Sequence, residues 1–147
     1  MEIPEHHKRT VIPHIFVDGA AEAIRFYQAA FDASELFRLA GDGDGDRDGG
    51  DGDDGGRIVH AEIVIHGATL MLSDAHLDPF APPAAAAGAS VALHVYVPDV
   101  DALTVQAVTA GAQLLSPPAD MPYGARQSML RDPFGHVWIF LTPLPAA

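Results

Sequence analysis

The sequence contains no cysteine. A disulfide framework, a thiolate metal site and a cysteine nucleophile are therefore excluded. With 147 residues the chain is long enough to bury a core without such cross-links. Its length fits one independently folding domain that spans residues 1–147.

Basic residues are scarce, since 8 Lys and Arg stand against 20 Asp and Glu, giving a formal net charge of -12. Nucleic-acid binding needs clustered Lys and Arg, so we expect no nucleic-acid partner. Much of the acidity is local, because the Gly-rich run at 41–56 contains seven Asp and one Arg. An EF-type calcium loop starting at Asp44 would need a bidentate Glu where Gly55 stands. We interpret this run as a solvated acidic loop without a binding site.

Long apolar runs are also missing. No segment approaches the run of about 18 apolar residues that a membrane span needs. The N-terminal stretch MEIPEHHKRT has no apolar signal region. We therefore expect no membrane partner and a soluble, cytoplasmic protein.

What the sequence does contain is a regular succession of short elements. The stretch VIPHIFV (11–17) predicts a strand that ends at a turn. AAEAIRFYQAAF follows with apolar residues at helical spacing on one side, which predicts a helix lying on a sheet. Strand patterns then occur at 34–40, 57–65 and 68–74, so this half of the chain has the order β, α, β, β, β.

The same order returns in the second half. A strand pattern at 91–97 and a helical pattern at 101–112 precede three further strand patterns, QLLSPP, ARQSMLRD and HVWIFLT. His14 and His94 occupy matching places in the two first strands, and Gly67 matches Gly135 before the last strand of each half.

The repeat divides the chain into module 1 at 10–74, which contains the acidic loop 41–56, and module 2 at 91–143. A Pro- and Ala-rich linker at 75–90 joins them. One face of a βαβββ unit stays open until another surface covers it, and duplication supplies that cover. We predict an α+β fold of two tandem βαβββ modules with the helices outside.

The segments VIPHIFVDGAAEAIRFYQAAF, HAEIVIHGATLMLSD, LHVYVPDVDA and RDPFGHVWIFLT resemble, in order and spacing, the vicinal oxygen chelate superfamily. This is the glyoxalase, bleomycin-resistance and dioxygenase group, and the chain looks most like its PhnB-like branch. The resemblance implies the glyoxalase/bleomycin-resistance fold, in which the two modules form a cup-shaped, barrel-like mixed sheet. In metal-using members each module supplies two ligands to a divalent ion that acts as a Lewis acid.

This chain departs from that metal pattern. The ligand positions that the resemblance implies are Ile12 and Ala92 in the first strands, and Met71 and Ile139 in the last strands. None of these side chains suits a hard or borderline divalent ion. We therefore predict no metal at the usual site and no other cofactor.

A displaced metal site is the alternative. His14 and His94 lie two residues after the vacated first-strand positions, and strand alternation puts each on the same face as the position before it. Together with Glu62 they could hold a divalent metal; otherwise both imidazoles line a polar part of the cavity wall. Both interpretations stay open from the sequence.

Strand alternation also selects the side chains that should bind a ligand. The predicted set is His14, Phe16, Met71, Ser73, His94, Tyr96, Tyr123 and Arg126. Tyr123 and Arg126 belong to a Pro/Gly turn that either closes over a cavity mouth or forms a surface loop with a local salt bridge.

A wall of apolar, aromatic and a few polar groups suits a small organic ligand. The first hypothesis is metal-independent sequestration of an organic ligand or antibiotic, as the resemblance implies for bleomycin-resistance members. The second is a lyase, isomerase or dioxygenase of the same superfamily with a metal at His14 and His94. No residue is assigned a catalytic role. The resemblance also implies a homodimer, which is the commonest assembly of soluble proteins.

Overall fold

The computed structural model describes residues 1–41, 56–84 and 88–146, so most of the acidic loop lies outside the described residues. The first module contains β1 (His14–Val17), α1 (Ala20–Phe31), β2 (Ser34–Ala40), β3 (Ile58–Ile65) and β4 (Ala68–Asp74). The second contains β5 (Ala92–Tyr96), α2 (Val100–Ala110), β6 (Gln113–Asp120), β7 (Ala125–Arg131) and β8 (Val137–Pro143). A short 3-10 helix, η1 (Glu5–His7), precedes them. The repeated βαβββ order is confirmed.

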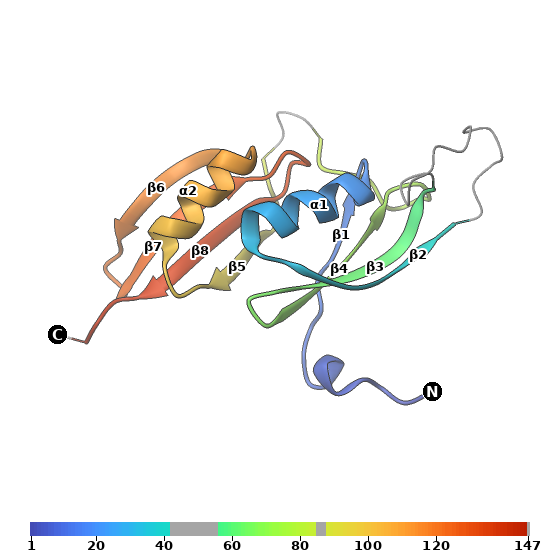
Figure 1. Cartoon of the computed structure of the whole chain (residues 1–147), viewed down its shortest axis with the longest axis horizontal. Coiled ribbons are helices and arrows are strands. Elements are labelled where there is room, and N and C mark those ends of the chain that lie inside the picture. Colours follow the sequence, from blue (N-terminus) through green and yellow to red (C-terminus); the bar gives the residue numbers. More distant parts are fainter. Residues whose placement is uncertain (42–55, 85–87, 147) are drawn as a thin grey trace.

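Each module forms its own four-stranded sheet (Figure 1). The strand order is β1-β4-β3-β2 in the first sheet, called sheet A here, and β5-β8-β7-β6 in the second, called sheet B. β1 pairs with β4 in parallel, as β5 does with β8, and the remaining pairs are antiparallel. Among the described residues no strand of one sheet pairs with a strand of the other. The predicted α+β fold of two modules is confirmed, and within the described residues its two sheets stay separate and do not close into a barrel.

The two helices lie side by side and cover one face of the sheets (Figure 1). The ring of Phe31 on α1 packs against two side chains of β8, with centroids 4.9 Å from Trp138 and 4.8 Å from Phe140. The helix of module 1 thus contacts the sheet of module 2, and a single core of buried residues spans both modules. Trp138 and Phe140 therefore point toward the helices.

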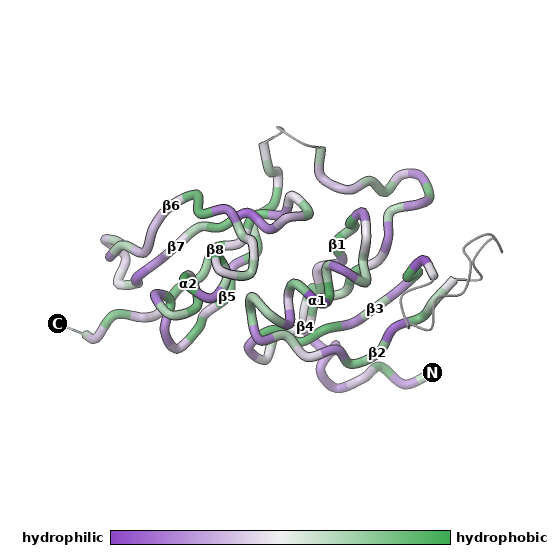
Figure 2. The backbone as a smooth tube through the Cα atoms, turned by 45° about the horizontal axis from the view of Figure 1, so that its top comes forward, coloured by the Kyte–Doolittle hydropathy of each residue, from purple (hydrophilic) through white to green (hydrophobic). Residues whose placement is uncertain are grey.

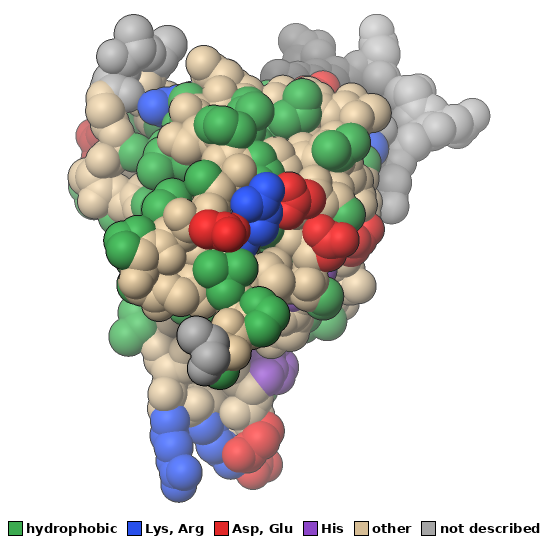
Figure 3. Space-filling model, turned by 90° about the vertical axis from the view of Figure 1, so that its left-hand side faces the viewer, with side chains coloured by type: hydrophobic (Ala, Val, Ile, Leu, Met, Phe, Trp, Pro, Cys, Tyr) green, Lys and Arg blue, Asp and Glu red, His purple; other side chains and the backbone are tan. Residues whose placement is uncertain are grey.

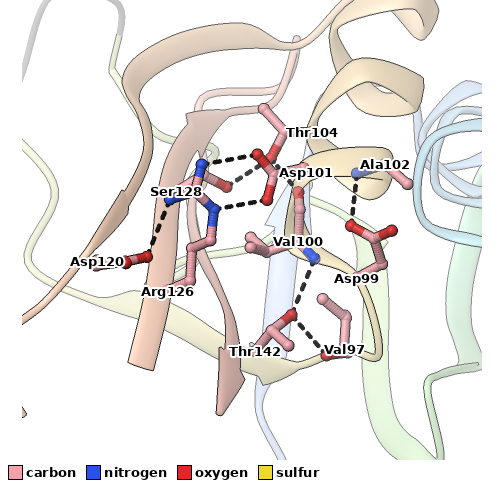
Figure 4. A network of polar contacts seen from close by, with 10 residues as sticks. All are labelled: Val97, Asp99, Val100, Asp101, Ala102, Thr104, Asp120, Arg126, Ser128 and Thr142. Carbon is pink, nitrogen blue, oxygen red and sulfur yellow. Dashed lines mark hydrogen bonds and ion pairs between the residues drawn. The ribbon is translucent and has the colours of Figure 1, made fainter. Parts of the chain in front are cut away.

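The starts of both helices are held by the last strand of their own sheet. The Asp74 carboxylate at the end of β4 accepts hydrogen bonds from the backbone N–H groups of Gly19 and Ala20, where α1 begins. A carboxylate there also complements the helix dipole. At the repeat-related place in module 2, the hydroxyl of Thr142 accepts from the N–H of Val100 at the start of α2 (Figure 4). Each helix is therefore fixed in position over its sheet.

Within the described residues, the opposite faces of the two sheets are not covered by an α-helix (Figure 1), and we call them the open faces. Figure 2 shows green apolar segments interrupted by purple polar ones along the strands, as expected for sheets covered on one side only. In the described part of the chain, no helix is long and apolar enough to cross a membrane.

Candidate functional site on the open faces

The open face of sheet A carries the module 1 residues that the sequence selected. Alternation along β1 and β4 buries Ile15 and Leu72 beneath the helices and turns the neighbouring side chains the other way. The register places His14 beside Met71 and Phe16 beside Ser73. These four predicted residues are therefore contiguous on the open face.

Three parallel rings dominate this face. Phe16 stacks on His14 with centroids 4.5 Å apart and an interplanar angle of 7°. On its other side it stacks on Phe80 at 4.2 Å and 9°. His60 of β3 meets the ring of His14 edge-on at 5.3 Å. Phe80 comes from the segment after β4 and is 52% exposed, so the stack is only partly covered.

His14 is held in one orientation, and its environment disfavours the charged form of its ring. Its Nε2 atom lies 2.9 Å from the hydroxyl of the buried Ser73. Burial lowers the pKa of His14, and the neighbouring His60 lowers it further. An uncharged imidazole stacked on phenylalanine presents an aromatic surface in place of a cation.

A cleft of about 430 Å³ opens beside this stack. His14 and Phe16 contribute an aromatic wall, and Pro83 of the linker also belongs to the lining. Arg131 and His136 from module 2 also line this cleft. The Nε2 atom of His136 donates to the carbonyl oxygen of Phe16 at 3.0 Å. The cleft therefore combines an aromatic wall with two basic side chains.

The open face of sheet B is built differently. Tyr96 on β5 is 64% exposed, and His94 lies beside Ile139 in the register of β5 and β8. Ile139 belongs to a small apolar cluster with Ala125, Leu141 and Met129, separate from the main core. The hydroxyl of Tyr123 donates to the side chain of Gln127 on β7.

A second cleft, of about 730 Å³, runs between β5 and the N-terminal segment (residues 1–13). His94 lines this cleft together with Ile12 and His6. His14 lines the first cleft, so within one chain the two repeat-related histidines border different spaces.

Arg126 points away from the open face. Its neighbour Ser128, two residues along β7, contacts Thr104 of α2 at 2.8 Å, which places this side of the strand under the helix. The guanidinium makes two bonds to the Asp101 carboxylate, at 2.6 and 2.9 Å, and one to Asp120 at 3.0 Å (Figure 4).

The surface at the module 2 end of the molecule carries charges of both signs (Figure 3). Figure 3 shows a basic group flanked by acidic ones among scattered apolar side chains. Hydrogen bonding by Arg126, outweighing the smaller effect of burial, holds the pKa of Asp101 below its usual value. The arrangement is the local salt bridge that the sequence left open as one of two interpretations.

Glu62 has a different environment from the one that the alternative metal site requires. It lies on the open face of sheet A and is 2% exposed. Its Oε1 atom accepts from the Nε2 atoms of His7 at 2.6 Å and His6 at 2.8 Å. Burial acts to raise the pKa of Glu62, but the hydrogen bonds and charges of His7 and His6 outweigh it and lower that pKa. Glu62 is thus brought together with two N-terminal histidines rather than with His14 and His94.

The residues that sequence reasoning missed come from irregular segments. Phe80 lies in the Pro- and Ala-rich stretch after β4, and η1 carries His6 and His7. Neither segment has the periodicity that assigns a side chain to a face. The adjacent pair of histidines in the N-terminal segment was the only signal available.

Comparison with known proteins places this architecture in a family. Residues 8–140 match the Glyoxalase/Bleomycin resistance protein/Dioxygenase superfamily, and the chain belongs to it. A relative in Mycobacterium bovis, the uncharacterized protein Mb0911c, is 37% identical over 136 residues, covering 90% of this chain and 82% of that protein.

Two solved structures show the same fold. TioX from Micromonospora sp. ML1 superposes with a TM-score of 0.66 at 24% identity, covering 94% of this chain and 98% of TioX. The fosfomycin resistance protein FosX from Mesorhizobium loti superposes with a TM-score of 0.61 at 12% identity, covering 92% of each chain. The α+β arrangement of two four-stranded sheets and two helices is the glyoxalase/bleomycin-resistance fold.

Proposed function

We propose that this protein binds a small organic ligand with a planar aromatic part and holds it without a metal at the positions that the family uses. The observation that carries the proposal is the stack of Phe80, Phe16 and His14 beside the first cleft. Stacked aromatic pairs contribute about 0.5–1.5 kcal/mol beyond the burial of their area. A planar ligand that lies against this wall would gain the same kind of contact.

The size and lining of the cleft support this choice. A volume of about 430 Å³ lies within the range of small-molecule pockets. Arg131 and His136 offer polar groups that could orient a carbonyl or an anionic substituent. No nucleophile or general base is required for such binding, so sequestration of an antibiotic is the simplest biological role. FosX, which shares the fold, is named as a resistance protein.

The proposal also includes the branch of the family, the cellular location and the oligomeric state that we expected from the sequence. We place the chain in the PhnB-like branch, in the cytoplasm and in a homodimer. Tyr96 on the open face of sheet B is 64% exposed and supports the dimer, because a partner chain could cover it. The module boundaries 10–74 and 91–143 are part of the same proposal.

Thermal unfolding in EDTA tests the binding proposal with a panel of aromatic antibiotics and natural products. A ligand that binds the folded state raises the midpoint by mass action. We expect at least one aromatic compound to do so, and we expect Phe16→Ala to abolish its effect. Phe37→Ala is the matched control, since Phe37 is an exposed phenylalanine on β2, outside the lining of the first cleft. A ligand effect that needs added metal, or that survives Phe16→Ala, would contradict the proposal.

An enzyme of the same superfamily is the second candidate. It is favoured by the equivalent register of His14 beside Met71 and His94 beside Ile139, which puts one histidine on each open face. In a dimer these faces could meet and hold a divalent metal between them. Elemental analysis of protein purified without chelator or tag separates the binding protein from the enzyme. The enzyme requires a bound ion, and that ion should be lost in the His14→Phe, His94→Phe double variant.

A further inference from the structure

Three metal-ligating side chains converge outside both the aromatic wall and the positions that the family uses. One ring nitrogen each of His6 and His7 and a carboxylate oxygen of Glu62 lie within 4.8 Å of one another. In the described part of the chain, no other group of three or more His, Asp or Glu side chains meets this condition. The carboxylate belongs to the rigid sheet, and both imidazoles belong to η1.

The geometry is close to that of a coordination site. The two imidazole rings have centroids 4.2 Å apart and are inclined by 65°. The Nε2 atom of each ring contacts the same Glu62 oxygen, Oε1. Zinc takes nitrogen and oxygen ligands at about 2.0–2.2 Å in tetrahedral sites, which separates the ligand atoms by roughly 3.3 Å. The present contacts of 2.6 and 2.8 Å would therefore need to widen by only about 0.5–0.7 Å to admit an ion.

We propose that His6, His7 and Glu62 bind one divalent transition ion of the zinc and nickel class. Imidazole ligands suit zinc and nickel, whereas calcium and magnesium take oxygen ligands. Two imidazoles and a carboxylate should therefore bind zinc or nickel more tightly than calcium or magnesium. The ion fastens the N-terminal segment across the open face of sheet A. His6 and Lys8 also line the second cleft, so the fastened segment forms one wall of that cleft.

This site is independent of the proposed ligand site. His14 and Phe16 line the first cleft, and none of His6, His7 and Glu62 does. An organic ligand can therefore bind in EDTA whether or not the ion site exists. Failure of one proposal leaves the other standing.

Titration with zinc and cobalt tests the inference on protein that carries no affinity tag. We expect one ion per chain by calorimetry and a visible cobalt absorption band. Glu62→Gln, and separately the His6→Ala, His7→Ala double variant, should weaken binding by at least tenfold, since even the loss of an outer-shell partner costs about 10–100-fold. His76→Ala is the matched control, because His76 is an exposed histidine whose hydrogen bond within the described residues is to the backbone of Asp74. This variant should bind the ion as the unaltered protein does.

Limited trypsin digestion gives a second readout. Lys8 and Arg9 are exposed and directly follow the two histidines. Bound ion should slow cleavage after them in the unaltered protein and in His76→Ala, and should leave the rate unchanged in the double histidine variant. That variant changes only residues outside the sheets, so it remains informative if Glu62→Gln does not fold. Absence of a stoichiometric ion, or binding that is unchanged in the double variant, would overturn the inference.

Discussion

The hydroxyl of Tyr27 on α1 donates a 2.6 Å hydrogen bond to the Asp132 carboxylate, joining residues 105 positions apart. The same carboxylate oxygen accepts from the indole N–H of Trp138 at 2.9 Å. Its other oxygen accepts from the backbone N–H groups of Phe134 and His136 in the turn before β8. Asp132 is thus a buried acceptor through which the helix of module 1 is fixed to the last strand of module 2.

Replacing Tyr27 by Phe should destabilise the fold while preserving its core. The ring remains, but a hydrogen bond to a buried charged group is lost, which costs about 1.5–3 kcal/mol. Urea unfolding measures the change in the free energy of unfolding. Ala29→Gly, an exposed change on the same helix, serves as a comparison and should cost no more than about 1 kcal/mol. A Tyr27→Phe variant as stable as the unaltered protein would show that the bond does not join the modules.

Stability should also fall at alkaline pH because of the same residue. Burial, the charge of Asp132 and the hydrogen bond to it raise the pKa of Tyr27 well above its usual value. A raised pKa in the folded state means that the stabilisation is complete below the unfolded value, about 10. It is lost as the pH rises from there through the folded pKa. Unfolding between pH 9 and 12 should show a steeper decline in the unaltered protein than in Tyr27→Phe, and equal slopes would contradict this assignment.

Replacing both His14 and His94 by Phe should leave folding intact and alter ligand selectivity. Phenylalanine preserves the aromatic stack on Phe16 while removing the contact with Ser73. Affinities for the compounds found by thermal shift should change relative to one another, and circular dichroism should show an unchanged fold. Complete loss of a measured turnover in this variant would instead indicate catalysis at these histidines.

Arg126→Ala should reduce thermal stability slightly and leave ligand binding unchanged. The guanidinium lies on the helix side of β7, where it pairs with Asp101 and Asp120 near the surface. Salt screens exposed ion pairs, so the loss in melting temperature should be smaller in 1 M salt than at low ionic strength. A salt-independent loss, or a weaker ligand response, would place Arg126 in the ligand site after all.

The sequence was sufficient for the repeated part of the fold and for its faces. Strict alternation in VIPHIFV and GATLMLSD fixes which side chains lie under the helices, so His14, Phe16 and Ser73 could be assigned to the open face. Phe80 could not, because the segment after β4 has no period. Arg126 was ambiguous because its direction depends on where β7 starts relative to the turn. Closure into a barrel depends on contacts between sheets, which the alternation within a strand does not encode.

The central claim is that an aromatic wall, rather than a metal, holds the ligand of this protein. A crystal structure with a compound from the thermal-shift panel, grown in EDTA, tests it most directly. We expect planar density against His14 and Phe16 in the first cleft, with Arg131 or His136 on its polar side. Density for a ligand coordinated to an ion between His14 and His94 of two chains would contradict the claim.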